Sequence, residues 1–290
     1  MVVADFSRLT SELWVIQSEL YATNHGIFVD HGAACLIDPG LTEASLERIA
    51  TFVVERQATV TAVVLTHAHW DHLLGAHRFP DAQMMAHCGF FDVIREHGDD
   101  LQKQIVAWDA ERGFERPASF ALPCPTVTFE DAMIVTVGET TIELVHAPGH
   151  APDQIAVYHA ESGALWAADM LSDLEIPLVS HSLSAYERTL ATIATLDGRV
   201  LVPGHGAATN DPAEIERRLA ADRAYLTELR ARVKRVLDAG QSLQATIDAC
   251  AEMSFREPEA NATAHQWNVE SAYVELGGRV KGRVGWDREW

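Results

Sequence analysis

The stretch THAHWDH at residues 66–72 follows directly on the apolar run TAVVL. A short apolar run of this kind is typical of a buried strand, so the polar groups fall where the strand gives way to a loop. His67 and His69 stand two residues apart, and on an extended strand end both rings face the same side. Asp71 and His72 follow on a turn and can face a second position. The sequence therefore predicts a strand end that gathers metal ligands.

Three further residues of the ligand type stand just after strand-like segments later in the chain. His150 lies in APGHAPD, Asp169 in WAADML and His205 in LVPGHGA. A glycine beside each of the two histidines lets the backbone turn sharply and come close to the site. A metal site needs imidazole and carboxylate ligands that converge from separated parts of the chain. These segments supply such ligands.

The order of the segments indicates an α/β body followed by a helical appendage. β-rich and α/β segments occur twice, the first ending before about position 120 and the second following it. After position 210, apolar residues recur at helical spacing with charged residues between them. We expect Asp211 to cap this helix and Pro212 to open it. Further helices are expected at SLQATIDACAEM and ATAHQWNVESAYVEL, and the chain divides into residues 1–210 and 211–290.

Charge and hydropathy exclude several classes of partner. The chain has 22 Lys and Arg against 42 Asp and Glu, which gives a formal net charge of -20. Nucleic-acid binders generally present a basic face, so we expect no nucleic-acid partner. No apolar run approaches the roughly eighteen residues of a membrane-spanning helix, and the start MVVADFSRLT lacks the features of a secretory signal. We therefore expect a cytoplasmic protein that acts on a small-molecule substrate and has no membrane partner.

The motifs H-x-H-x-D-H-x-x-G, LIDPG, PGH, AAD and PGHG stand in this chain as a set. The set resembles the metallo-β-lactamase superfamily over roughly residues 13–210. The resemblance implies the α/β class, as a four-layer αββα sandwich, with a binuclear metal site at one edge. It also implies the ligands: His67, His69 and His150 for the first metal, Asp71, His72 and His205 for the second, Asp169 as the bridge, and Asp38 of LIDPG as the carboxylate that orients a ligand.

Such a site implies a hydrolase. Two divalent ions that share a water lower its pKa toward neutrality, and the resulting bridging hydroxide is the nucleophile. Asp71 is the ligand to which we assign a catalytic role, because it is placed to accept a hydrogen bond from the hydroxide and later to move a proton. Zinc is the expected metal for these ligands, and iron or manganese would fit the same set. The expected substrate is a small ester, lactone or thioester.

At several motif positions this chain differs from known subfamilies of the superfamily, and each difference disfavours the function of that subfamily. Asp169 stands where true metallo-β-lactamases have Cys or Ser, and GHAPDQ lacks the second histidine of glyoxalase II. Ser172 stands where acyl-homoserine lactonases commonly have tyrosine, and His69 stands where the flavodiiron branch has glutamate. The acidic charge disfavours the nuclease branch.

Three alternatives stay open at this point. One is a persulfide dioxygenase that uses a single iron, although the retained second-metal residues Asp71, His72 and His205 disfavour it. Another is a hydrolase with promiscuous β-lactamase or phosphodiesterase activity. The third is a noncatalytic binding module, which has no need for seven convergent ligands.

The segment SDLEIPLVSHSLSAY follows the AAD motif, in the region where this superfamily builds its pocket wall. His181 and Tyr186 of this segment are therefore candidates for substrate contact, and Trp70 inside the first motif is a candidate for an apolar rim. His265 or Trp267 could reach the mouth of the pocket from the last predicted helix.

The role of the appendage is left open between two arrangements. Its helices, with Trp286 and Trp290 near the end of the chain, could form a contact in a homo-oligomer or fold back onto the body. Packing against the body is the interpretation that we favour for its amphipathic stripe.

Overall fold

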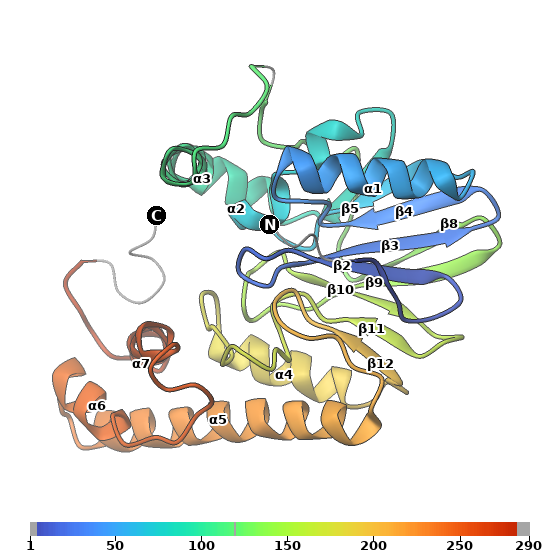
Figure 1. Cartoon of the computed structure of the whole chain (residues 1–290). Coiled ribbons are helices and arrows are strands. Elements are labelled where there is room, and N and C mark those ends of the chain that lie inside the picture. Colours follow the sequence, from blue (N-terminus) through green and yellow to red (C-terminus); the bar gives the residue numbers. More distant parts are fainter. Residues whose placement is uncertain (1–4, 119, 283–290) are drawn as a thin grey trace.

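The computed structural model describes residues 5–118 and 120–282, so that Trp286 and Trp290 lie outside the described residues. Two β-sheets lie face to face, with helices on the outer face of each (Figure 1). This is the predicted αββα sandwich of the α/β class. The first sheet contains β1 (Ser7–Arg8), β2 (Leu13–Gln17), β3 (Asn24–Asp30), β4 (Ala33–Ile37), β5 (Thr59–Val64), β6 (Gln83–His87) and β7 (Val127–Phe129). The second contains β8 (Ala132–Val137), β9 (Thr140–His146), β10 (Ile155–His159), β11 (Ala164–Trp166) and β12 (Val200–Val202).

The helices lie on both sides of the sandwich. They are α1 (Glu43–Glu55), α2 (Trp70–Leu73), the 3-10 turn η1 (Ala76–Arg78), α3 (Phe90–Arg112), α4 (Leu183–Ile193), α5 (Pro212–Asp238), α6 (Leu243–Cys250) and α7 (Ala262–Glu275). Figure 1 shows α1 and α3 on the side of the first sheet, and α4 and α5 on the side of the second. The helices predicted after position 240 are confirmed as α6 and α7.

The direction of the strands brings the sequence motifs to one edge. Strands β1 to β4 are antiparallel, whereas β4 to β7 run parallel. The carboxyl ends of parallel strands meet at the same edge of a sheet, so Asp38 after β4 lies near residues 66–72 after β5.

The prediction that the first β-rich unit ends before about position 120 is wrong by one strand. Strand β7 pairs with β6, and a strand of three residues gives little periodic signal of its own.

Alternating side chains bury both faces of the sheets. In β10, Ile155 and Val157 face the core between the sheets, while Ala156 and Tyr158 face the core beneath the helices. Such two-sided burial requires helices outside the sheets as well as a second sheet inside.

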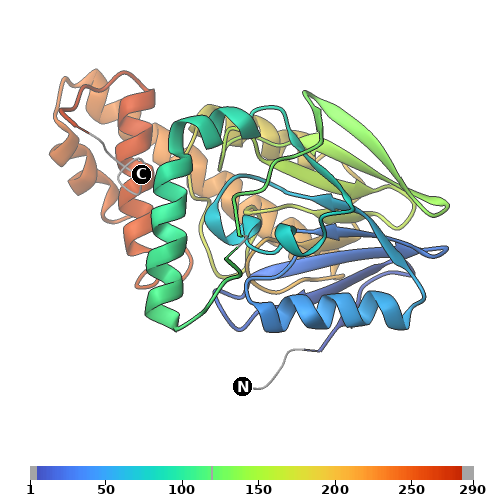
Figure 2. The same ribbon diagram turned by 90° about the horizontal axis from the view of Figure 1, so that it is seen from above.

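In the described part of the chain after position 210, the secondary structure consists of the helices α5, α6 and α7, as predicted. The Asp211 side chain accepts a hydrogen bond from the Ala213 amide at 3.0 Å, and Pro212 is the first residue of α5, which confirms the predicted cap. Apolar residues of α5, α6 and α7 share one core with α4 and the second sheet. Figures 1 and 2 place α3 and α7 at the same end of the sandwich, on opposite sides of it. The division at position 210 stays a prediction.

None of the helices in the described part of the chain combines the length and the apolar character needed to span a membrane.

Candidate metal centre

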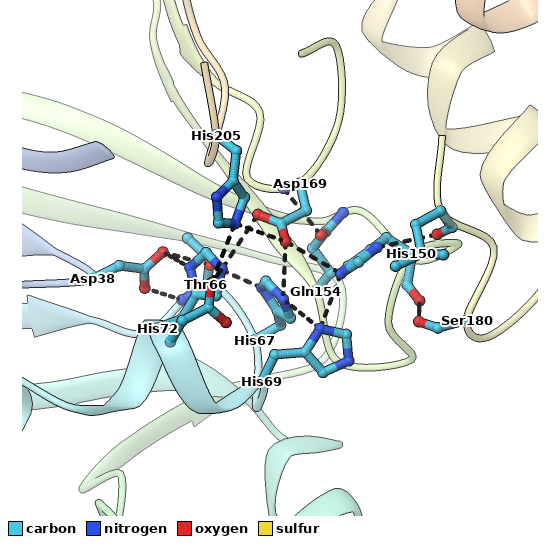
Figure 3. Close-up of polar contacts among 12 residues, drawn as sticks. Asp38, Thr66, His67, His69, His72, His150, Gln154, Asp169, Ser180 and His205 are labelled. Atoms are coloured by element: carbon cyan, nitrogen blue, oxygen red, sulfur yellow. Dashed lines mark hydrogen bonds and ion pairs between the residues drawn. The ribbon is translucent and has the colours of Figure 1, made fainter. Parts of the chain in front are cut away.

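Three histidine rings of the predicted first group converge at the edge of the sandwich. His69 Nδ1 lies 3.0 Å from His67 Nε2 and 3.0 Å from His150 Nε2. Asp169 joins this group, with Oδ2 at 3.3 Å from His150 Nε2 (Figure 3). All four side chains are buried or nearly so. Nitrogen atoms that point at one another at this separation are arranged for a shared cation rather than for mutual hydrogen bonds alone.

The second predicted group lies beside the first. His205 Nε2 is 3.2 Å from Asp71 Oδ2, and His72 Nε2 is 3.6 Å from the same oxygen. Asp169 reaches this group too, because its Oδ1 lies 3.3 Å from His72 Nε2 and its Oδ2 lies 3.5 Å from His205 Nε2. Asp169 therefore lies between the two groups, as a bridging carboxylate would.

Hydrogen bonds behind the rings set which nitrogen faces the cluster. The Nδ1 atoms of His72, His150 and His205 contact the Asp38 carboxylate, the Leu178 carbonyl and the Tyr21 carbonyl at 2.9, 3.0 and 3.0 Å, respectively. Because each of these partners accepts, Nδ1 carries a proton and Nε2 is the nitrogen that faces the cluster and can bind a metal.

Two atoms at the centre of the cluster support the same conclusion. His72 Nε2 and Asp169 Oδ1 are buried and make no hydrogen bond. Buried polar atoms in native proteins nearly always have a hydrogen-bonding partner or bind an ion. Imidazole nitrogen and carboxylate oxygen are ligands that zinc, iron and manganese accept. The residues therefore fit divalent metal binding.

Two buried carboxylates hold the loop that carries the first motif. Asp38 accepts from the Thr66 amide at 2.8 Å and from the Thr66 hydroxyl at 2.6 Å, in addition to His72. Asp153 accepts from the Ala68 amide at 3.0 Å, and its other oxygen makes no hydrogen bond. The position of Asp38 agrees with the orienting role that the resemblance implies, whereas Asp153 was missed by sequence reasoning.

Burial favours the neutral form of the first group of histidines. It lowers the pKa of His67 well below the usual value, lowers that of His69 to about 3, and lowers that of His150 as well. Neutral imidazole is the form that binds metal, so these three rings need no deprotonation before they can act as ligands.

The second group has the opposite electrostatics. Burial alone would lower the pKa of His72 and of His205, but the nearby carboxylates, above all Asp169, raise both pKa values well above the usual value. Burial would likewise raise the pKa of Asp71, but His72 and His205 lower it to about 2. This group therefore holds positive charge beside its carboxylates, which a metal ion would supply in place of the protons.

Glycine is required where two of the motifs approach their neighbours. A Cβ atom on Gly204 would lie 2.1 Å from Asp169 Oδ1. Gly149 has a φ of +142°, and a Cβ atom there would lie 2.3 Å from Tyr186 Cα. The glycines of the two PGH segments therefore let the ligand-bearing loops pack against Asp169 and α4.

A pocket of about 510 Å³ opens onto the cluster. Asp71, Asp169 and three of the histidines face it, so that the cluster forms its floor. One side of the pocket, which we call the C-terminal wall, is formed by the loop at residues 172–182 and the residues at the start of α7. The pocket-lining residues of this wall are Leu174, Glu175, Ile176, Leu178, Ala260, Asn261, Thr263, Ala264 and Trp267.

The predicted substrate contacts are only partly in place. Trp70 and Trp267 line the pocket. His181 does not line it, because Ser182 caps α4 and the preceding residue turns out to solvent. Tyr186 is fully buried on the inner face of α4, where its hydroxyl donates to the Asp169 carbonyl at 3.2 Å. His265 is also buried away from the pocket, against the Tyr225 hydroxyl at 2.9 Å.

Tyr21 is a pocket residue that sequence reasoning missed. Its carbonyl contacts His205 Nδ1, while its ring lines the pocket and packs edge-on against Trp70 at 5.8 Å between centroids. Its φ is +57°, a conformation that costs energy for a bulky residue. No pattern in the sequence predicts a positive φ angle at this tyrosine.

Three polar residues spaced seven apart attach α7 to the C-terminal wall. Asn261 accepts from the Ile176 amide at 3.3 Å and donates to the Leu174 carbonyl at 2.9 Å. Asn268 accepts from the Val179 amide at 2.7 Å and donates to the Pro177 carbonyl at 2.6 Å. Glu275 accepts from the Leu183 amide at 2.6 Å and the Ser184 amide at 2.9 Å, at the start of α4. A spacing of seven keeps all three on one face of the helix.

The model of the metallo-beta-lactamase superfamily matches residues 20–205, which include all seven candidate ligands. The atrochrysone carboxyl ACP thioesterase of Aspergillus fumigatus is 27% identical over 223 residues, which are 73% of this chain. The match spans only 61% of that relative. The hydroxyacylglutathione hydrolase GloC of Haemophilus influenzae is 25% identical over 194 residues, which cover 63% of this chain and 84% of the relative.

A solved structure extends the likeness of fold to the appendage. A metallo-beta-lactamase family protein of Thermus thermophilus superposes with a TM-score of 0.68 at 19% identity. The superposition covers 96% of this chain and 98% of that one. The helices after position 210 are therefore included in the shared fold.

Proposed function

The chain belongs to the metallo-beta-lactamase superfamily, and on that premise we propose that it is a binuclear metal-dependent hydrolase of a small ester, lactone or thioester. The observation that carries this proposal is the position of Asp169, whose carboxylate lies between the two groups of ligands: Oδ2 faces His150 and His205, and Oδ1 faces His72. Both relatives described above are hydrolases by name, and the name thioesterase of the fungal relative favours a thioester.

The residues divide the chemical work between them. Divalent ions, when bound, supply a Lewis acid for the carbonyl oxygen of the substrate and lower the pKa of a water molecule. Asp71 lines the pocket, and its Oδ2 faces His205. Its Oδ1 is the atom that we assign to accept the proton of the attacking water and to pass it to the leaving group. The apolar residues of the pocket lower the local dielectric constant, which strengthens the electrostatic interactions at the floor.

Metal content tests the proposal most directly. We would purify the wild type and Asp169→Ala without added metal and measure bound metals by elemental mass spectrometry. Asp197→Ala is the matched control, since the Asp197 side chain is 82% exposed and lies outside the cluster. We expect about two equivalents of zinc or manganese in the wild type and in the control, and fewer in Asp169→Ala, because the variant loses the shared ligand.

Activity completes the test. Hydrolysis of a panel of esters, lactones and thioesters should fall by more than about a hundredfold in Asp169→Ala, since loss of a residue that merely orients a ligand already costs ten- to a hundredfold. One equivalent of iron, with oxygen uptake on a thiol persulfide and no hydrolysis, would refute the binuclear hydrolase.

A further inference from the structure

The C-terminal wall presents a single carboxylate to the pocket, that of Glu175. The residue is exposed and lines the pocket. Its side chain makes no hydrogen bond or ion pair with any residue that the structure describes. Elsewhere near the wall, acidic side chains are paired: Asp222 with Arg256, and Glu214 with Arg218 at 2.7 Å. Glu175 therefore differs from its acidic neighbours.

The backbone around Glu175 is held firmly although its side chain is not. The Glu175 amide donates to Ser172 Oγ at 3.1 Å, and the Glu175 carbonyl accepts from Arg256 Nη1 at 2.8 Å. Asn261 binds the residues on both sides of it, through the Leu174 carbonyl and the Ile176 amide. Four hydrogen bonds thus fix the backbone of a residue whose charged side chain has no hydrogen-bonding partner among the described residues. Such preorganisation reduces the entropy lost when a ligand binds.

The nearby cations are already committed to other partners. Arg256 pairs with Asp222 and also donates to the Ser172 carbonyl. Arg218 donates to Glu214 and to the Ala207 carbonyl at 2.8 Å. Neither guanidinium group is available to pair with Glu175. The charge of His205 on the floor acts on Glu175, but the two side chains form no ion pair, so a bound molecule can supply a positive charge in direct contact with Glu175.

Aromatic rings complete the surroundings of this carboxylate. Tyr21 and Trp70 line one side of the pocket, and Trp267 lines the C-terminal wall. Aromatic faces attract ammonium groups through their negative quadrupole, and a carboxylate adds a full charge of the right sign. The remaining lining of the C-terminal wall is largely aliphatic, which suits the hydrocarbon part of a substrate.

We infer that the site takes an ester or thioester that carries a positively charged amine, and that Glu175 is the residue that selects this charge. The inference rests on the proposed function. The reacting carbonyl group would lie at the floor, and the ammonium group would lie against the C-terminal wall. An anionic substrate of the same size would be repelled by Glu175.

The test compares two nitrophenyl esters that differ only in charge. One has an acyl chain that ends in trimethylammonium, and the other ends in its neutral isostere, tert-butyl. We expect the metal-loaded wild type to prefer the ammonium ester by about five- to tenfold in kcat/KM, which is the size of one partly exposed ion pair with a ring contact. Glu175→Gln should remove the preference and leave the neutral ester unchanged. Glu252→Gln, an exposed substitution outside the pocket, is the matched control.

A binding measurement gives a readout that does not depend on turnover. Benzyltrimethylammonium should change the tryptophan fluorescence of the metal-free wild type and of Glu252→Gln, and should bind about five- to tenfold more weakly to Glu175→Gln. Equal preference for the two esters in the wild type and Glu175→Gln would overturn the inference and leave the hydrolase standing. Loss of bound metal in Glu175→Gln would also overturn it, since Glu175 would then be a ligand. Failure of the metal-loaded wild type to hydrolyse either ester or any member of the wider panel would instead remove the proposed function, and the inference with it.

Discussion

The floor and the C-terminal wall of the pocket are built by different means. On the floor, side chains hold other side chains: Asp38 orients His72, and Asp169 lies between the two ligand groups. In the C-terminal wall, side chains of α7 hold the main chain of a loop, through Asn261 and Asn268. The identity of each residue is therefore fixed on the floor. In the wall, the hydrogen bonds from Asn261 and Asn268 fix the path of the loop, which leaves the pocket-lining side chains of Leu174 and Glu175 free to serve recognition.

The largest expected effect comes from a change on the floor. Asp38 accepts three hydrogen bonds, from His72 Nδ1, the Thr66 amide and the Thr66 hydroxyl, and Asp38→Asn leaves only one accepting oxygen for them. The His72 ring therefore loses the partner that fixes its tautomer. We expect the affinity of the second metal to fall about ten- to a hundredfold, while the first ligand group keeps its metal. A competitive titration of the metal-free protein with zinc and a chromophoric chelator measures both steps. An equal loss at both steps would contradict the separation into two groups.

A smaller effect tests whether the two regions are coupled. Asn268 binds the residues on either side of Leu178, whose carbonyl contacts His150 Nδ1. Asn268→Ala should lower the free energy of unfolding by about 1–3 kcal/mol, because it leaves buried backbone groups unpaired. It should also weaken metal binding by about tenfold.

Asn261→Ala is the matched comparison for that variant. It removes hydrogen bonds to the backbone of Leu174 and Ile176 and of Arg256 and Glu257. None of these four residues forms a hydrogen bond or ion pair with a candidate ligand among the described residues. Denaturation of the metal-free variants, followed by zinc titration, should give similar losses of stability but a loss of metal affinity only for Asn268→Ala. If both variants bind zinc as the wild type does, the wall and the floor are independent.

The smallest effect is a dependence of stability on pH that comes from Asp153, the buried carboxylate that accepts from the Ala68 amide. Burial raises the pKa of Asp153 to about 7, whereas an unfolded aspartate titrates near about 3.9. The folded state therefore holds a proton that the unfolded state has released, and the stability of the metal-free protein falls as pH rises between these two values.

Asp153→Asn removes this loss and keeps an oxygen that can accept from the Ala68 amide. The melting temperature of the metal-free variant should exceed that of the wild type by about 3 °C or more at about pH 8, and by less at about pH 5. Thermal unfolding followed by circular dichroism at the two pH values measures the difference. A constant difference would show that Asp153 does not titrate in this range.

The floor could be predicted from the sequence because its chemistry repeats at fixed spacing. His67 and His69 are two residues apart after a strand, and His150 and His205 each follow a glycine that a close approach requires. Such constraints act over a few residues, so they leave a local signal. The sandwich was implied by the family resemblance that these motifs carry, and the two-part order of strands and helices agreed with it.

The C-terminal wall could not be predicted in the same way. Asn261, Asn268 and Glu275 sit on a helix where polar residues at regular spacing usually indicate a solvated face. Their partners are backbone groups about 85–95 positions away, and backbone groups carry no sequence signal. His181 lies outside the pocket lining for a related reason, since the start of α4 decides which way that side chain turns. The place of Tyr21 in the pocket could not be predicted, because it depends on a positive backbone φ angle that the sequence does not indicate.

The seven-residue spacing of the polar anchors on α7 has a consequence for how this protein could diversify. Asn261 and Asn268 bind backbone amides and carbonyls, and Glu275 accepts from backbone amides. Every amino acid except proline provides both of these backbone groups. Mutations at positions such as Leu174 or Glu175 can thus alter the shape and charge of the entrance without loosening the loop that bears them. Helix α7 therefore holds the backbone of the loop in place whatever side chains Leu174 and Glu175 are replaced by. A library randomised at those loop positions should yield folded proteins with new substrate preferences.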